Sequence, residues 1–177
     1  MTTWTELRSA TRDTLVAAGV GGGVVDVSRF APIQAVEGTT YVRVYLRSGR
    51  YAADGHQGTG EPTFNRERRL MISVYRAAGA ADAIDDDLDA DIDAVLAALL
   101  TNAEWVGLTD GVGSIDIDYD AKEDGEFRSV EATISIEVFD WVHYPPVIAD
   151  HFETAAIRTS LGQDEPGTGA DLTLPTY

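Results

Sequence analysis

The sequence predicts an α+β fold, with a mixed or antiparallel sheet of about five strands packed by two helices and followed by an extended C-terminal arm. Three observations predict it. Two segments repeat apolar residues at helical spacing, several others alternate apolar and polar residues, and this periodicity ends near residue 141. A chain of 177 residues suits one principal core. We therefore expect a domain over residues 1–141 and an arm over residues 142–177.

The first predicted helix begins after Thr3. Thr3 and Glu6 have the spacing of a capping box, in which each side chain accepts a hydrogen bond from the other residue's backbone amide. Gly19 ends the helix, and the glycines 21–23 predict a flexible hinge. A phosphate loop is disfavoured because no Lys-Ser/Thr pair follows them. The apolar stripe of the helix consists of Trp4, Leu7, Ala10, Thr11, Leu15 and Ala18.

Three strands are predicted between the helices, over residues 24–27, 41–47 and 64–75, because the apolar period changes there to two. Residues 48–62 are rich in Gly, Asp and His, and they predict a long exposed loop.

The second helix is the clearest segment of the chain. Aspartates fill its outer positions, and those near its start suit the positive end of the helix dipole by about 0.3–1 kcal/mol each when exposed. Its predicted buried face consists of Ile84, Leu88, Ile92, Val95, Leu96 and Leu99.

A hairpin is predicted after Gly113. Asp116, Asp118 and Asp120 alternate with apolar residues, a turn falls at residues 123–126, and a second alternating segment returns over residues 130–139. Beyond it we expect at most a short helical turn at residues 152–157.

The charge is large and unevenly distributed. The net charge is −17; residues 1–80 carry 10 basic and 7 acidic side chains, whereas residues 81–177 carry 3 and 23. Such a chain repels phosphate backbones, which disfavours ordinary binding of nucleic acid. A single lysine accompanies twelve arginines. This composition is consistent with a GC-rich genome and with adaptation to high salt.

The motifs of common catalytic and metal sites fail in detail. The chain has no cysteine, and its three histidines have no zinc-binding spacing. The series that starts at Asp116 lacks the Gly and Glu of a calcium loop, and Ser114 lacks the second glycine of a hydrolase elbow. No window is apolar enough for a membrane span. We therefore expect no catalytic residue, cofactor or metal, and we predict that the chain is not an enzyme.

One basic cluster stands out in this acidic chain, namely Arg66, Arg68 and Arg69 on the third predicted strand. It has two interpretations: an outward strand face with local ion pairs, or a subunit interface. In the second, the arginines of one copy meet the hairpin or second helix of the next copy. Opposite patches on one subunit make head-to-tail contacts, which close into rings when the rotation permits. The helix residues predicted for this contact are Asp85, Asp86 and Asp89.

The order of the segments resembles the lambda-like minor tail protein family of tail terminators in long-tailed viruses. The resemblance covers about residues 3–141 and includes LRSATRDTLVAAG, YVRVYL, RRLMISVYR, DDDLDADIDAVLAALL and SVEATISIEVFDW. Together with the acidic, lysine-poor composition, it suggests a virus of halophilic archaea, and a bacteriophage with a GC-rich genome is the alternative.

The resemblance implies a structural protein that forms a ring, expected to be a hexamer. Such a ring caps the tail tube, ends its polymerisation and joins the tail to the head connector. Its implied partners are further copies of itself, the tail tube protein and the head–tail connector protein. The expected location is the tail–neck junction of the virion, and the host cytoplasm during assembly. DNA would pass through the lumen without specific binding, and Asp116, Asp118 and Asp120 are candidate lumen residues.

Two alternatives remain. A neck or head-completion connector would also be an acidic ring-forming protein. A small halophilic ligand-binding domain or enzyme would instead be a monomer with a deep pocket.

Overall fold

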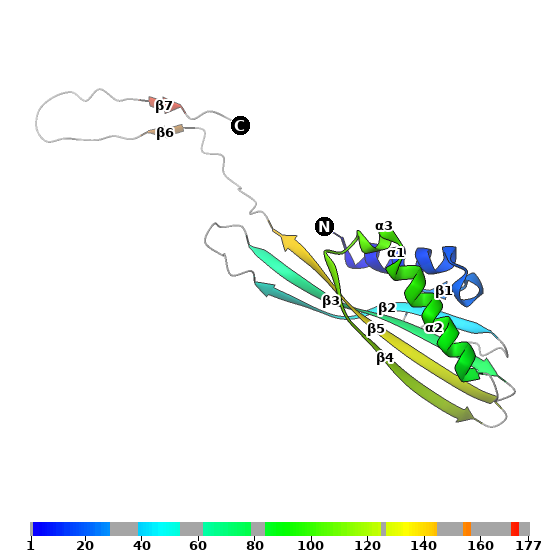
Figure 1. Cartoon of the computed structure of the whole chain (residues 1–177). Helices are drawn as coiled ribbons and strands as arrows, with labels where there is room; N and C mark the ends of the chain where they lie inside the picture. Colours follow the sequence, from blue (N-terminus) through cyan, green and yellow to red (C-terminus); the bar gives the residue numbers. More distant parts are fainter. Residues whose placement is uncertain are drawn as a thin grey trace, which may run out of the picture. The chain divides into compact units, whose positions relative to one another are not determined.

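The computed structural model describes residues 2–28, 39–53, 62–78, 84–124, 127–144, 154–156 and 171–173. It divides into two compact units, Met1–Tyr144 and Pro145–Tyr177. The first unit contains a five-stranded mixed sheet and three α-helices, and the second contains a two-stranded antiparallel sheet (Figure 1). The predicted α+β class is confirmed.

The five-stranded sheet has the order β1-β2-β3-β5-β4. Only β1 is parallel to its neighbour, and the other pairs are antiparallel. Both edges of the sheet are therefore formed by strands distant in sequence. The strands are β1 (Val25–Asp26), β2 (Thr40–Ala53), β3 (Thr63–Ala78), β4 (Gly111–Asp124) and β5 (Phe127–His143).

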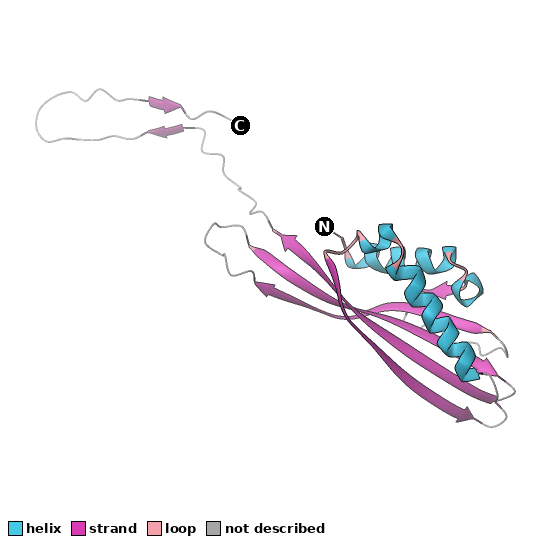
Figure 2. Cartoon of the chain, viewed as in Figure 1, coloured by secondary structure: helices cyan, strands magenta, loops and turns pink. Residues whose placement is uncertain are grey.

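The helices lie over one face of this sheet, and no helix among the described residues lies over the other face, which we call the bare face (Figure 2). They are α1 (Trp4–Ala17), α2 (Ile84–Leu100) and α3 (Ala103–Val106). The two predicted helices are α1 and α2. The third was missed because four residues show no helical period; Asn102 starts it by accepting hydrogen bonds from the amides of Glu104 and Trp105 at 2.9 and 3.0 Å.

The predicted capping box begins α1. The amide of Glu6 donates to the Thr3 hydroxyl at 3.1 Å, and the amide of Thr3 donates to the Glu6 carboxylate at 2.6 Å. Gly19 follows the helix with a φ of +73°, a conformation that suits glycine. The predicted hinge is one turn of 3-10 helix, η1 (Val20–Gly23).

The core lies between the helices and the covered face of the sheet. The predicted apolar positions of α2 face this core, with Leu96 partly buried and the other five buried. Each buried Leu, Val or Ile contributes about 1.5–3 kcal/mol relative to an exposed side chain. The core residues of the sheet include Val42, Val44, Leu70, Ile72, Val74, Ile134, Ile136 and Val138.

Several predicted boundaries differ from the structure. Residues 48–53 belong to β2 rather than to a loop, because the backbone continues its pairing with β3 beyond a bulge after Leu46. Residues 54–61, which are the rest of the predicted loop, and the turn residues 125–126 lie outside the described residues. The helical turn predicted at residues 152–157 is wrong: β6 (Thr154–Ala156) pairs there with β7 (Asp171–Thr173).

Candidate assembly surfaces

Two of the three predicted interface arginines are buried inside the subunit. The side chains of Arg66 and Arg68 are 1% and 0% exposed. They precede Leu70 at alternate positions of β3 and therefore point to the same face as Leu70, which the helices cover. The outward strand face predicted for these two residues is wrong, and neither side chain can reach a neighbouring subunit in this conformation.

The buried arginines share one carboxylate. Arg66 Nε donates to Asp140 Oδ1 at 2.8 Å, and its Nη2 pairs with Oδ2 of the same residue. Arg68 Nη2 lies 3.2 Å from Asp140 Oδ2 but is not aligned for a hydrogen bond. The Arg68 Nη1 atom instead donates to the carbonyls of Thr2 and Thr3 at 3.2 and 3.3 Å. The cluster thus ties the start of α1 to the sheet.

The pKa values of the two arginines shift in opposite directions. Hydrogen bonds to Asp140 raise the pKa of Arg66, whereas burial lowers the pKa of Arg68. An arginine stays protonated in proteins, so the cluster holds two positive charges against one negative charge.

The other predicted interface residues are more accessible. Arg69 is 37% exposed on the bare face and lies 3.8 Å from the carboxylate of Glu137. Asp85, Asp86 and Asp89 are exposed on α2, on the opposite side of the sheet. The structure therefore does not bring the two charge groups together within one subunit, and their contact between subunits stays a prediction.

Asp89 also has a partner of its own. It accepts a hydrogen bond from the Tyr119 hydroxyl at 2.9 Å, and this bond raises the pKa of Tyr119. On either side of Asp89 along α2, Asp87 and Asp91 pair with Arg76 of β3 at 2.7 and 3.0 Å. Some of the aspartates of α2 therefore hold this helix on the sheet.

The three candidate lumen residues lie together on the bare face. Ile115 and Ile117 of β4 pack against the core, so the alternation of the strand points Asp116, Asp118 and Asp120 the other way. All three are exposed. They form a row of carboxylates along one edge strand; their place in a lumen stays a prediction.

The opposite edge is basic, a feature that the sequence reasoning missed. β2 carries Arg43, Arg47 and Arg50 and contains no acidic residue. Arg47 and Arg50 are exposed. The signal was present in the sequence, but residues 48–53 were assigned to a loop, which hid the continuity of the basic strand.

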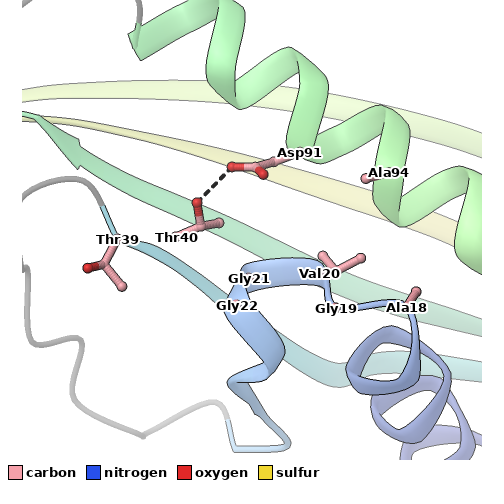
Figure 3. Close-up of a pocket in the computed structure, with 9 residues that line it drawn as sticks. All are labelled: Ala18, Gly19, Val20, Gly21, Gly22, Thr39, Thr40, Asp91 and Ala94. Atoms are coloured by element: carbon pink, nitrogen blue, oxygen red, sulfur yellow. Dashed lines mark hydrogen bonds between the residues drawn. The ribbon is translucent and has the colours of Figure 1, made fainter.

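A shallow pocket of about 320 Å³ lies between the glycine turn η1, the start of β2 and the helix α2 (Figure 3). Its carboxylate, Asp91, accepts hydrogen bonds from Thr40 at 2.8 Å and from Arg76 at 3.0 Å. A phosphate would be repelled by this carboxylate, and a cation would compete with Arg76. The pocket therefore suits a structural contact better than a ligand site.

Within the part of the chain that the structure describes, no three His, Asp or Glu side chains gather as a metal site. In the same part, no helix is long and apolar enough to cross a membrane.

No family model and no curated protein matches the chain. Among solved structures, it is similar to a chain described as "Virion of native gene transfer agent (GTA) particle". The two are 22% identical with a TM-score of 0.43, over 75% of this chain and 94% of that chain. A likeness of this size concerns part of the chain path and assigns no function.

Proposed function

We propose that this chain is a structural virion protein that forms a ring, expected to be hexameric, on the end of the tail tube of a tailed virus. The ring ends tube polymerisation and joins the tail to the head connector, and the chain catalyses no reaction. The order of segments over residues 3–141 suggests this role. The observation that carries it is the presence of two exposed sheet edges with opposite charge.

The two edges are open to another chain. β1 pairs with β2 only at Val42 and Arg43, and no other strand in the described ranges lies on that side. The outer side of β4 likewise has no strand partner among the described residues. Such edges are templates for strand addition, which natural monomers avoid by covering or blunting them.

Strand direction and level both suit a head-to-tail contact. Three successive antiparallel pairings make β4 antiparallel to β2. A second copy displaced sideways would therefore place its β2 antiparallel to β4 of the first. Through the registers of β3 and β5, Val44 lies level with Ile117, and Arg50 lies level with Gly111. Arg47, beyond the stretch that β1 covers, would then lie diagonal to Asp116, which is level with Tyr45.

Repetition of this contact gives a closed ring when the rotation permits. The bare face, with its row of carboxylates on β4, would line the lumen, and the face covered by the helices would form the outside of the ring. Carboxylates repel the phosphates of DNA, so DNA would pass without binding. A neck or head-completion connector would use the same edges, and the partner on each face of the ring separates the two roles.

The contact is testable by charge reversal. We expect closed oligomers near six from the wild-type chain at the lowest salt at which it folds, alone or with tail tube protein. R47E/R50E and D116R/D118R should each abolish them, since both edges of each variant then carry one sign. An equimolar mixture should restore even-numbered rings, because each edge again meets its opposite. Native mass spectrometry measures the stoichiometry.

R12E on α1 is the matched control, because Arg12 is a partly exposed arginine on a helix and belongs to neither edge strand; its rings should be unaffected. A wild-type chain that stays monomeric even with tube protein would contradict the ring. If both double variants still form rings, the ring proposal stands but the proposed contact between the sheet edges is contradicted.

A further inference from the structure

One end of the sheet carries a cluster of aromatic side chains, at the C-terminal end of β5. The ring centroids of Tyr51 and Phe64 are 6.2 Å apart, and those of Phe64 and Tyr144 are 6.1 Å apart, both edge to face. Tyr51 and Tyr144 are each 42% exposed. We call Tyr51, Phe64 and Tyr144 the aromatic end. Exposed aromatic clusters of this kind are typical of binding surfaces rather than of ordinary solvated surface.

The aromatic end lies next to the buried arginine cluster. Arg66 Cζ is 6.0 Å from the centre of the Tyr51 ring, within cation–π range. Burial tends to raise the pKa of Tyr51, but hydrogen bonds with Arg66 and Trp4, the charge of Arg66 and a hydrogen bond with Tyr144 together lower it. The Tyr51 hydroxyl therefore lies in a positive field, because two arginines share the single carboxylate of Asp140.

The same field has unused hydrogen-bonding capacity. Arg68 Nε and Nη2 are buried and make no hydrogen bond to any described residue. The strand residues of this end, 47–53, 63–69 and 137–144, carry five arginines and three carboxylates, whereas the whole chain has a net charge of −17. The strand residues of this end therefore have a positive charge balance, which favours a negative group.

We propose that the aromatic end is a docking surface for an acidic protein segment, one that presents carboxylates beside apolar side chains. The apolar side chains would pack on the three rings, and a carboxylate would accept hydrogen bonds from the tyrosine hydroxyls in the field of the arginines. Tyr and Arg are the residues that most often dominate binding energy at protein interfaces. A nucleic acid fits less well, since its closely spaced phosphates would meet the negative charge elsewhere on the subunit.

This inference goes beyond the ring and does not need it, because the aromatic end differs from the edges that would join subunits. Strands joined edge to edge have their ends at the two open faces of a ring. In such an assembly, the aromatic ends of all subunits would lie on one face of the ring and would form a binding surface there for a neighbouring protein.

The test uses the full chain and a short fluorescent peptide of glutamate, leucine and proline, in which proline prevents addition to a sheet edge. We expect saturable binding by fluorescence anisotropy. A peptide with glutamine in place of glutamate should bind the wild-type chain at least about tenfold more weakly. The glutamate peptide should likewise bind the variants Tyr51→Ser and Tyr144→Ser at least about tenfold more weakly. A tenfold change corresponds to the loss of about 1.4 kcal/mol of binding free energy.

Tyr119→Ser is the matched control, since Tyr119 is 61% exposed on β4 and outside the aromatic end; its binding should equal that of the wild type. Equal losses in Tyr51→Ser and Tyr119→Ser would overturn the proposal. So would equal binding of the glutamine analogue, no saturable binding of the acidic peptide, or preferential binding of an oligothymidine. Each readout is independent of oligomeric state, so a failed ring and a failed docking surface are distinguishable.

Discussion

At the scale of single residues, Asp140 stands out because it pairs with two buried arginines. Its carboxylate is the negative partner of both Arg66 and Arg68, and its side chain is only 7% exposed. The net stabilisation by a buried ion pair is small, because desolvation offsets the attraction. Removal of one partner is different, because it leaves an uncompensated buried charge.

We therefore predict that Asp140→Asn lowers the free energy of unfolding by about 3–5 kcal/mol, since two buried arginines lose their counter-charge. Urea unfolding at fixed salt measures the change. Asp13→Asn is the control: Asp13 also pairs with an arginine, but its side chain is 63% exposed, so the change should stay below about 1 kcal/mol. Similar losses in the two variants would contradict the role of burial.

At the scale of elements, the glycine turn η1 sets how α1 connects to β1. Gly21 and Gly22 both have left-handed backbones, with φ of +62° and +65°. They differ in their surroundings. A Cβ atom on Gly21 would lie 2.9 Å from Val42 Cγ2, whereas one on Gly22 would meet nothing within 4 Å. The turn thus needs glycine at position 22 for its backbone conformation alone, and at position 21 both for conformation and because a Cβ atom does not fit.

This difference predicts unequal effects of alanine. Gly22→Ala should cost about 1–2 kcal/mol, the usual cost of a left-handed conformation in a residue with a Cβ. Gly21→Ala should cost more, since it also displaces Val42, a core residue. Thermal unfolding of the two variants checks the order, and equal losses would show that the turn adjusts to the added methyl group.

At the scale of the whole molecule, the charge balance sets the response to salt. With 30 acidic and 13 basic residues, like charges repel over most of the chain. Many of the α2 and β4 carboxylates are exposed, where salt screens them effectively. The Debye length falls from about 10 Å at 0.1 M salt to about 3 Å at 1 M.

We predict that the melting temperature rises with potassium chloride from low to molar concentration, because screening weakens this repulsion. Calorimetry at a series of salt concentrations measures the slope. The variant D116N/D118N should melt higher at low salt and show a smaller slope, since two exposed neighbouring charges of β4 are removed. A flat or falling melting temperature in the wild type would contradict adaptation to salt.

The end of the first unit makes a second prediction at this scale. Val142 is fully buried and lies opposite Phe64 in the sheet, and the amide of Tyr144 donates to the carbonyl of Pro62 at 3.1 Å. The predicted core boundary after Trp141 therefore omits a core residue. Truncation after Tyr144 should leave the stability of this unit unchanged.

Truncation after Trp141 should in contrast lose about 1.5–3 kcal/mol with the burial of Val142. Circular dichroism and urea unfolding of the two truncated chains provide the measurement. If the chain that ends at Tyr144 unfolds, residues 145–177 contribute to the stability of the first unit, and a separate arm is contradicted.

The local pattern of the sequence was sufficient to predict α1, α2, the β4–β5 hairpin and the α+β class. The capping box of Thr3 and Glu6 and the apolar period of α2 relate residues three or four positions apart, so both can be recognised from the sequence alone. The period of two likewise placed Asp116, Asp118 and Asp120 on one face of a strand. Net charge and its uneven distribution are properties of composition alone.

Only the tertiary structure decided which charges are available to a partner. Arg66 and Arg68 look like surface residues in the sequence, but they are buried and bind Thr2 and Asp140 through contacts that span more than 60 residues. The basic edge and the order of the strands also depend on pairing between distant segments. Short-range periodicity carries no information about such pairing, because burial and edge position arise only when the elements pack together.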